Sequence, residues 1–358
     1  MAQSFITIDS KKIGEGYPPF LVAEMSANHN GTLQKALQMI KTAKTNGADA
    51  IKIQTYTPET MTIDCSKPDF IIRGGLWDGY KLYDLYDRAH TPYEWHKTLF
   101  DAARSADITI FSTPFDESAI DLLEDLGVCA YKIASFEIVD LALIKYAAST
   151  KKPLIISTGT AQKSEIDEAL SAARESGATE IALLHCVSAY PTPVCEARLN
   201  MIDLLAKRYK TVVGLSDHTL GTTAAIAAVA LGARLIEKHF TLSRASGGAD
   251  SAFSIEPNEL KLLSKQINEA YLALGGGAFE RSKAEESSLR FRRSLYFVKD
   301  IKAGEKITAE HIRKIRPGMG LAPKFFDAVI GAEALIDIER GTPVTPSALK
   351  ANCVFDTI

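Results

Sequence analysis

Short apolar runs alternate with amphipathic stretches along most of the chain, and this alternation limits the fold more than any other feature. Each run has the length of a buried strand, and a polar connection leads from it into helical spacing. The expected strands are 20–25, 50–53, 108–111, 130–134, 154–156, 181–184, 212–215 and 235–240. The expected helices are 32–45, 92–105, 116–126, 141–149, 163–175, 198–207, 221–231 and 257–274. Eight such pairs in about 250 residues predict an α/β fold, the (β/α)8 TIM barrel.

An open, doubly wound sheet is the alternative for strands and helices in this order. That fold would place a glycine-rich dinucleotide loop after the first strand, and no such loop follows Glu24. Residues 6–17 predict a hairpin that turns near Lys11 and Lys12 and plugs the bottom of the barrel. The long connection 54–91 is rich in aromatic residues, and we expect it to lie over the top of the barrel.

The pattern changes towards the end of the chain. Residues 280–292 are charged and poorly periodic, which is typical of a linker. Residues 298–308 and 335–345 form a weak repeat, and each half predicts a strand, a glycine turn and a second strand. We therefore predict a barrel domain over 1–279, a linker over 280–292 and a small β-rich domain over 293–358.

Composition excludes several classes of protein. The net charge of -3 argues against nucleic-acid binding driven by the release of counterions. No apolar run approaches the roughly 20 residues that a membrane helix needs, and the N-terminal residues have no signal-peptide pattern. The five cysteines (Cys65, Cys129, Cys186, Cys195 and Cys353) are scattered and odd in number. Such thiols are typical of a cytoplasmic protein.

Polar residues stand at the ends of all eight expected strands, where a TIM barrel carries its active site. They are Glu24, Lys52, Gln54, Ser112, Thr113, Lys132, Ser135, Glu137, Ser157, His185, Tyr190, Ser216, Asp217, His218, Glu237 and His239. Any one of them alone is as well explained by a hydrogen-bonded strand cap. Burying lysine and glutamate together costs several kcal/mol unless they are paired or bind a ligand, so the full set predicts an active site.

His218 and His239 are the best candidate metal ligands, because they end neighbouring strands of the predicted barrel. Imidazoles with added oxygen ligands suit a Mn²⁺- or Mg²⁺-type site, although two histidines alone are a weak signal. Glu237 shares a face with His239 and is expected to hold a metal-bound water or to orient a ligand.

Lys52 and Lys132 point into the same mouth, where the serine and threonine hydroxyls add further donors. This combination suits a small phosphate ester with two or three negative charges. A Schiff-base aldolase is the alternative enzyme, and it needs no metal. A carbohydrate-binding protein is the non-enzymatic alternative, but it does not need buried lysine, glutamate and histidine together.

Several motifs closely resemble the sialic acid synthase family, and they follow the order of that family over essentially the whole chain. They are AEMSANHNG (23–31), KIQTY (52–56), STPFD (112–116), YKIAS (131–135), HCVSAYPT (185–192), GLSDHT (214–219) and IEKHFT (236–241). The tail from Arg293, with IRPGMG (315–320), resembles the antifreeze-like (SAF) domain that ends those enzymes. Residues 74–96, 135–141 and 249–257 resemble the pseudaminic acid branch of the family.

The resemblance implies that phosphoenolpyruvate condenses with 2,4-diacetamido-2,4,6-trideoxy-altrose (6-deoxy-AltdiNAc), and that phosphate leaves by C–O cleavage. The alternative products are N-acetylneuraminate and legionaminic acid. It implies a divalent cation (Mn²⁺, Mg²⁺ or Co²⁺) on His218 and His239, and a domain-swapped homodimer in which Arg316 reaches the partner's sugar. The implied phosphoenolpyruvate contacts are Lys52, Thr113, Lys132, Ser135, Ser157 and Ser216; the sugar contacts are Gln54, Glu137, Tyr190 and Asp250; the general acid/base is Glu24. We expect Lys52, Lys132 and Glu137 to act with Glu24 in catalysis.

Overall fold

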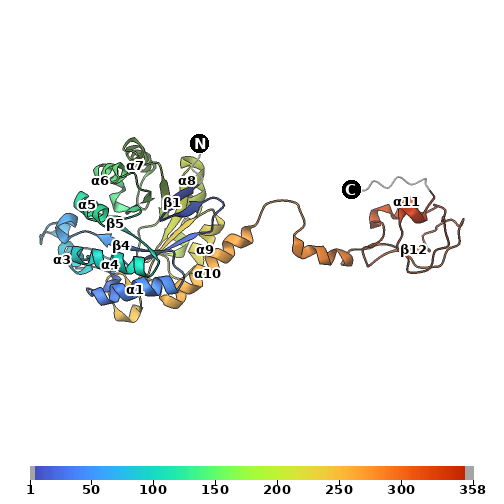
Figure 1. The fold of residues 1–358 in the computed structure, drawn as a ribbon, viewed down its shortest axis with the longest axis horizontal. Coiled ribbons are helices and arrows are strands. Elements are labelled where there is room, and N and C mark those ends of the chain that lie inside the picture. Colours follow the sequence, from blue (N-terminus) through green and yellow to red (C-terminus); the bar gives the residue numbers. More distant parts are fainter. Residues whose placement is uncertain (1–4, 351–358) are drawn as a thin grey trace. The chain divides into compact units, whose positions relative to one another are not determined.

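The computed structural model describes residues 5–350, and these form two compact units that meet between Gly275 and Gly276 in the sequence. In the first unit, eight parallel strands close into a barrel in the order β10-β3-β4-β5-β6-β7-β8-β9, which confirms the predicted fold (Figure 1). The barrel strands are β3 (Phe20–Glu24), β4 (Ala50–Thr55), β5 (Thr109–Pro114), β6 (Tyr131–Ile133), β7 (Leu154–Ser157), β8 (Ile181–Cys186), β9 (Val212–Asp217) and β10 (Leu235–His239).

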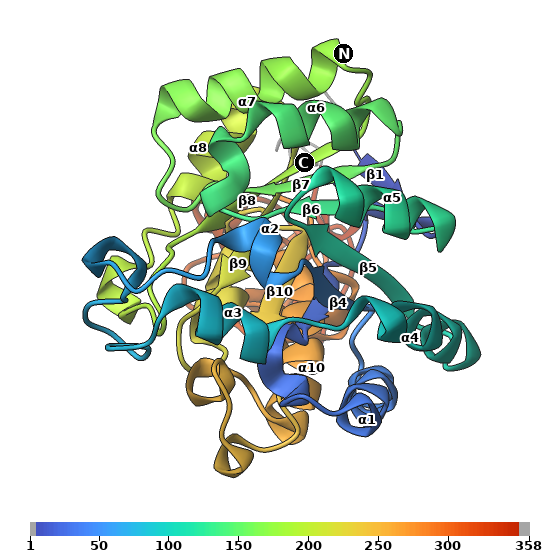
Figure 2. The same cartoon turned by 90° about the vertical axis from the view of Figure 1, so that its left-hand side faces the viewer.

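Helices surround these strands (Figure 2). They are α1 (Leu33–Thr45), α4 (Tyr93–Ser105), α5 (Glu117–Asp125), α6 (Leu141–Ser149), α7 (Lys163–Glu175), α8 (Met201–Tyr209), α9 (Thr223–Ala230) and α10 (Pro257–Leu274). Aspartates fix the start of two of them, because Asp116 accepts the amide hydrogen of Ala119 and Asp140 that of Leu143. Apolar residues of strands and helices form one continuous core, so the polar strand ends stand out from their surroundings.

A hairpin of β1 (Phe5–Ile8) and β2 (Lys11–Gly14) precedes the barrel. The predicted turn near Lys11 and Lys12 is wrong, because the chain turns at Asp9 and Ser10, which both have positive φ. The hairpin covers the bottom of the barrel as expected, with Thr7 N donating to Glu180 just before β8 and Lys11 paired with Asp49 just before β4.

The long connection after β4 contains α2 (Pro58–Met61), a 3-10 turn η2 (Pro68–Phe70) and α3 (Leu82–Ala89). Between η2 and α3, Ile72 N donates to Tyr80 O and Gly79 N donates to Ile72 O, so this part folds back on itself. Trp77 Nε1 donates to Ala249 O in the loop after β10 at 3.0 Å. The connection therefore lies over the mouth of the barrel, as expected; by mouth we mean the end at which the strands finish.

The second unit begins with a 3-10 helix, η7 (Lys283–Phe291), within the segment expected to be a linker. It continues with an antiparallel pair, β11 (Ser294–Phe297) and β12 (Ile312–Ile315), and a short helix, α11 (Phe326–Val329). The two halves of the sequence repeat pair with each other, because Ile301 and Ile338 exchange both backbone hydrogen bonds. The unit has a separate apolar core. The predicted domain extends to 358, but its last residues and Cys353 lie outside the described part of the chain.

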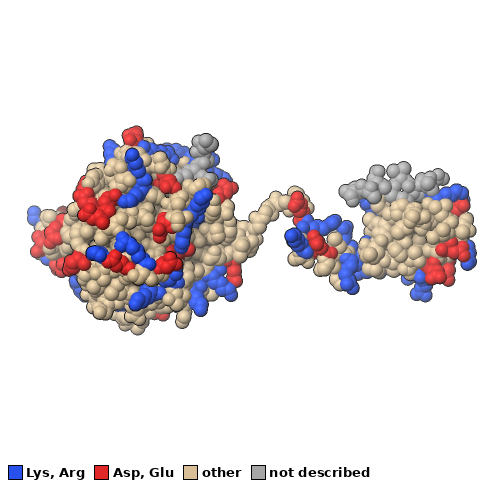
Figure 3. All heavy atoms as spheres, in the orientation of Figure 1, with Lys and Arg blue, Asp and Glu red and all other residues tan. Residues whose placement is uncertain are grey.

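No helix among residues 5–350 is long and apolar enough to cross a membrane. On the face of the barrel that Figure 3 shows, acidic and basic side chains are interspersed, in keeping with the small net charge.

Candidate active site

Four of the charged side chains predicted at the strand ends meet in the centre of the mouth, and all four are buried: Glu24, Lys52, Lys132 and Glu237. Lys52 Nζ lies 2.5 Å from Glu24 Oε2 and donates a hydrogen bond of 2.9 Å to Thr113 Oγ1. Lys132 Nζ lies 3.4 Å from Glu237 Oε1, and Lys52 Nζ lies 3.9 Å from the same oxygen. Glu237 therefore stands between two ammonium groups, and Glu24 flanks one of them.

Burial dominates the protonation equilibria of this cluster. It raises the pKa of Glu24 from 4.5 to about 7, although Lys52 acts in the opposite direction. Burial also lowers the pKa of Lys132. For Glu237, burial opposes ionisation, but Lys132 and Lys52 outweigh it and hold the pKa below its usual value. Because two lysines surround Glu237, the centre of the mouth suits an anionic substrate.

Hydroxyl groups beside this cluster converge on the backbone of Gly159. Gly159 N donates to Ser135 Oγ at 3.1 Å. A Cβ at Gly159 would lie 2.6 Å from Ser135 Oγ and would overlap Ser188 Oγ, so any other residue here would displace these two serine side chains. Ser157 Oγ at the end of β7 is buried and has no hydrogen-bond partner within residues 5–350. Free hydroxyl groups of this kind can bind the oxygens of a phosphate or carboxylate.

The two histidines lie together at the ends of β9 and β10, with ring centroids 5.4 Å apart. His218 Nδ1 lies 3.0 Å from Val187 O, which orients the ring and leaves Nε2 for another ligand. Among the residues that the structure describes, neither the buried His239 Nδ1 nor the buried Glu237 Oε2 has a hydrogen-bond partner. Both atoms carry lone pairs that could coordinate a divalent cation. Between residues 5 and 350, no three or more His, Cys, Asp and Glu side chains come together as a metal site, so water or substrate would complete the coordination.

Aromatic rings cover the imidazole pair. The ring centroid of Tyr190 lies 4.4 Å from that of His218 and 5.2 Å from that of Phe253. Asp250 Oδ2 lies 3.9 Å from His239 Nδ1. The structure therefore brings the two predicted sugar contacts Tyr190 and Asp250 to the histidines.

The remaining predicted residues lie at different distances from this centre. Ser216 Oγ donates to Glu237 Oε1 at 3.1 Å, and Gln54 is half-buried beside Thr113 in the β4–β5 register. Glu137 lies in the 3-10 turn η3 (Phe136–Val139), where burial raises its pKa to about 7. Arg316 is exposed and lies in the second unit.

Sequence reasoning did not assign a role to several residues of this region. Lys238 Nζ forms a fully buried pair with Asp217 at 2.7 Å and also donates to Thr219 O. This pair holds the segment that carries His218. Cys186 has its Sγ 3.9 Å from His218 Nδ1. The alternation of Glu237, Lys238 and His239 along β10 is the signal that could have shown Lys238 facing away from the mouth.

Comparison with known proteins relates the chain to sugar acid synthases. A model of the NeuB family matches residues 39–279, and a model of the SAF domain matches residues 292–350. Pseudaminic acid synthase from Campylobacter jejuni is 45% identical over 331 residues, which cover 92% of this chain and 96% of that protein. N,N'-diacetyllegionaminic acid synthase from C. jejuni is 37% identical over 315 residues, or 87% of this chain and 94% of that protein. The crystal structure of N-acetylneuraminic acid synthetase from Leptospira borgpetersenii, in complex with citrate, has a TM-score of 0.73 and 34% identity, and the match covers 82% of this chain and 97% of that chain.

Proposed function

Because the chain belongs to the NeuB family, we propose that it is a pseudaminic acid synthase, which condenses phosphoenolpyruvate with 6-deoxy-AltdiNAc and releases phosphate. One observation carries the proposal: a single buried mouth combines two lysines, two carboxylates and a pair of imidazoles, and within residues 5–350 the Nδ1 of His239 has no hydrogen-bond partner. The higher identity to the pseudaminic acid synthase than to the legionaminic acid synthase, 45% against 37%, supports the choice of acceptor.

In this reaction the methylene carbon of phosphoenolpyruvate forms a bond to the aldehyde carbon of the open-chain sugar. The enol carbon becomes electron-deficient, water adds to it, and phosphate leaves as its C–O bond breaks. Lys52 and Lys132 bind the carboxylate and phosphate, with hydroxyl donors from Ser135, Ser157 and Thr113. Glu24, with a pKa of about 7, takes the proton of the added water and can return it to the leaving group or to the aldehyde oxygen.

We propose that His218 and His239 hold the divalent cation Mn²⁺, Mg²⁺ or Co²⁺. When bound, it would polarise the aldehyde as a Lewis acid. Changing His239 to Ala should abolish turnover and weaken Mn²⁺ binding measured by equilibrium dialysis, while the circular dichroism spectrum stays unchanged. Unchanged Mn²⁺ binding in this variant would contradict the ligand assignment.

We also propose a homodimer in which the SAF domain of one subunit covers the mouth of the other, and Arg316 reaches the partner's sugar. Large apolar side chains exposed in three loops at the mouth support a covering partner. They are Phe136, Val139, Val194 and Leu220, exposed by 58, 57, 61 and 58%. The free thiols of Cys65, Cys129, Cys186 and Cys195 support a reducing, cytoplasmic location.

Phosphate release from phosphoenolpyruvate is the deciding experiment. It should be measured with 6-deoxy-AltdiNAc, the gluco-type diacetamido sugar and N-acetylmannosamine, each with and without a chelator. We expect the highest kcat/KM for 6-deoxy-AltdiNAc, loss of activity with the chelator, and transfer of labelled bridging oxygen to phosphate. If another acceptor is preferred, the product of the enzyme is legionaminic acid or N-acetylneuraminate. Turnover that resists the chelator, together with a covalent adduct trapped by borohydride, would favour a Schiff-base aldolase.

A further inference from the structure

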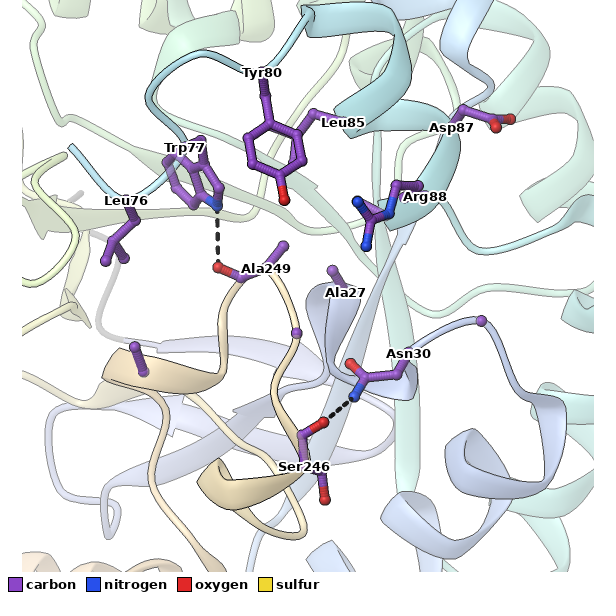
Figure 4. Close-up of a pocket in the computed structure, with 14 residues that line it drawn as sticks. Ala27, Asn30, Leu76, Trp77, Tyr80, Leu85, Asp87, Arg88, Ser246 and Ala249 are labelled. Atoms are coloured by element: carbon purple, nitrogen blue, oxygen red, sulfur yellow. Dashed lines mark hydrogen bonds between the residues drawn. The ribbon is translucent and has the colours of Figure 1, made fainter. Parts of the chain in front are cut away.

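A cavity of about 720 Å³ lies at the mouth, beside the imidazole pair and not part of it. One wall comes from the long connection after β4, with Leu76, Trp77 and Tyr80, and the opposite wall from the loop after β10, with Gly248 and Ala249 (Figure 4). Its size is that of a pocket for a small molecule.

The cavity shares a wall with the predicted sugar contact Asp250. Ala249 lines the cavity, and Asp250 directly follows it with Oδ2 3.9 Å from His239 Nδ1. Ala27 lines the cavity too, while its backbone N–H donates to Asp250 Oδ2 at 3.4 Å. A sugar held at Asp250 with its aldehyde at the histidines therefore has this cavity next to its other end.

Trp77 lies at the boundary between the cavity and the reacting centre. Its Nε1 donates to Ala249 O at 3.0 Å, which ties the two walls together (Figure 4). Its ring centroid lies 5.7 Å from that of Tyr190, whose ring in turn lies 4.4 Å from that of His218. One contact series thus connects the cavity wall to a proposed metal ligand.

The lining combines methyl-sized apolar surface with a few polar groups. Leu76, Leu85, Ala249 and Ala252 supply the apolar part, and Arg88 and Asp87 supply a hydrogen-bond donor and an acceptor. Gly248 allows the loop to approach closely, because a Cβ there would overlap Asn30 Oδ1. Such a surface favours methyl and acetamido groups over a chain of free hydroxyls.

We propose that this cavity binds the end of the acceptor sugar remote from its aldehyde, namely the 6-deoxy methyl group and the 4-acetamido group, and that Trp77 determines this preference. The inference rests on the proposed function and adds a binding site to it. N-acetylmannosamine carries hydroxyl groups at both positions, so contact with the same walls should add little to its binding affinity.

The first test measures kcat/KM for 6-deoxy-AltdiNAc and for N-acetylmannosamine in the wild type, Trp77→Ala and Trp77→Phe. We expect Trp77→Ala to lower the ratio of the two values by at least about tenfold, mainly through the KM of the 6-deoxy acceptor, with the KM of phosphoenolpyruvate unchanged. Trp77→Phe, which keeps a ring but loses the N–H, should lie between. Leu272→Ala is the control, because Leu272 is a residue of α10 that is 74% exposed.

The second test needs no turnover. The chain has two tryptophans, Trp77 and Trp95, and Trp95 lies in α4 against the ring of His29. Titration with the alditol of 6-deoxy-AltdiNAc should change the tryptophan emission of the wild type and leave that of Trp77→Phe unchanged.

The outcomes separate the cavity from the reaction. If the wild type does not convert the 6-deoxy acceptor, the proposed function is wrong, and the inference is wrong with it. If it does, but the ratio is the same in Trp77→Ala, or the alditol changes emission equally in Trp77→Phe, the inference alone is wrong. An emission change that follows protein concentration and not the alditol would assign the cavity to a second copy of the chain, which also overturns the inference.

Discussion

At the scale of single residues, two carboxyl groups at the mouth titrate in the neutral range. Burial is the main cause for both, and it raises the pKa of Glu24 and of Glu137 from 4.5 to about 7. Only Glu24 lies beside a lysine of the central cluster, with Lys52 Nζ 2.5 Å away. Position, and not pKa, therefore distinguishes the proposed acid/base residue.

We predict that kcat/KM for phosphoenolpyruvate falls below pH 7, because Glu24 must be ionised to accept the proton of the added water. In Glu24→Gln this pH dependence should disappear, and kcat should fall by at least about a hundredfold. A pH profile from pH 5.5 to 9 measures both effects.

Glu137→Gln is the matched control, since its carboxyl group has a similarly raised pKa outside the central cluster. It should keep the fall below pH 7. If Glu137→Gln loses the fall and Glu24→Gln keeps it, the roles of the two carboxyl groups are exchanged.

Residues in regular strands could be placed from the sequence alone. The two-residue period put Lys52 and Gln54 on one face of β4, and Glu237 and His239 on one face of β10. Neighbours across the barrel could not be placed in this way, because their distances depend on the closed sheet. The pairing of Glu237 with Lys132, and of Cys186 with His218, therefore required the structure.

At the scale of elements, β9 and β10 are joined behind the histidines by the Lys238–Asp217 pair, whose side chains are 0% and 1% exposed. We predict that Lys238→Met lowers the free energy of unfolding by roughly 3–5 kcal/mol, because it leaves the Asp217 carboxylate buried and unpaired. Urea unfolding followed by circular dichroism measures this change.

Lys207→Met provides the comparison. Lys207 also pairs with an aspartate at 2.7 Å, Asp203, but it is 73% exposed, so the loss should be at most about 1 kcal/mol. Equal losses in the two variants would show that burial of the Lys238–Asp217 pair is unimportant.

The turn after β7 gives a second prediction at this scale. Gly159→Ala should raise the KM of phosphoenolpyruvate by about tenfold or more, because the new Cβ would push apart the hydroxyl groups of Ser135 and Ser188. Gly276→Ala, where a Cβ would meet nothing within 4 Å, should leave KM unchanged. A normal KM in Gly159→Ala would mean that these hydroxyl groups do not bind phosphoenolpyruvate.

Elements with a strong period were predicted well, and short irregular ones were not. Apolar runs located all eight barrel strands, because each is buried on both faces. The predicted position of the first hairpin turn was wrong, because the turn depends on positive φ at Asp9 and Ser10, which composition did not indicate. The helix η7 was missed, although Ser282 and Glu285 form a capping box at its start.

At the scale of the whole molecule, the change of pattern near residue 279 indicated two units, and contacts divide the chain at Gly275 and Gly276. Each unit has its own apolar core, so each was recognisable from its local pattern. The assembly of the units into an active enzyme depends on a second chain in our proposal, which no pattern in one sequence can place.

A mixing experiment tests that assembly. Arg316→Ala and His239→Ala should each be inactive alone, because one lacks the proposed sugar contact from the SAF domain and the other lacks a proposed metal ligand. In a dimer of one chain of each kind, the barrel of the Arg316→Ala chain would receive an intact Arg316 from its partner. Random association makes about half of the dimers mixed, each with one intact site, so co-refolding should restore about a quarter of the wild-type activity.

The control is co-refolding of His239→Ala with Lys52→Ala. Both of these changes lie in the barrel, so each site in a mixed dimer lacks one barrel residue and no activity should return. If Arg316→Ala and His239→Ala also fail to restore activity while native mass spectrometry shows mixed dimers, Arg316 acts on the barrel of its own chain. If activity is restored, each active site contains residues of both subunits. Only then can a mixed dimer form one site that carries neither substitution.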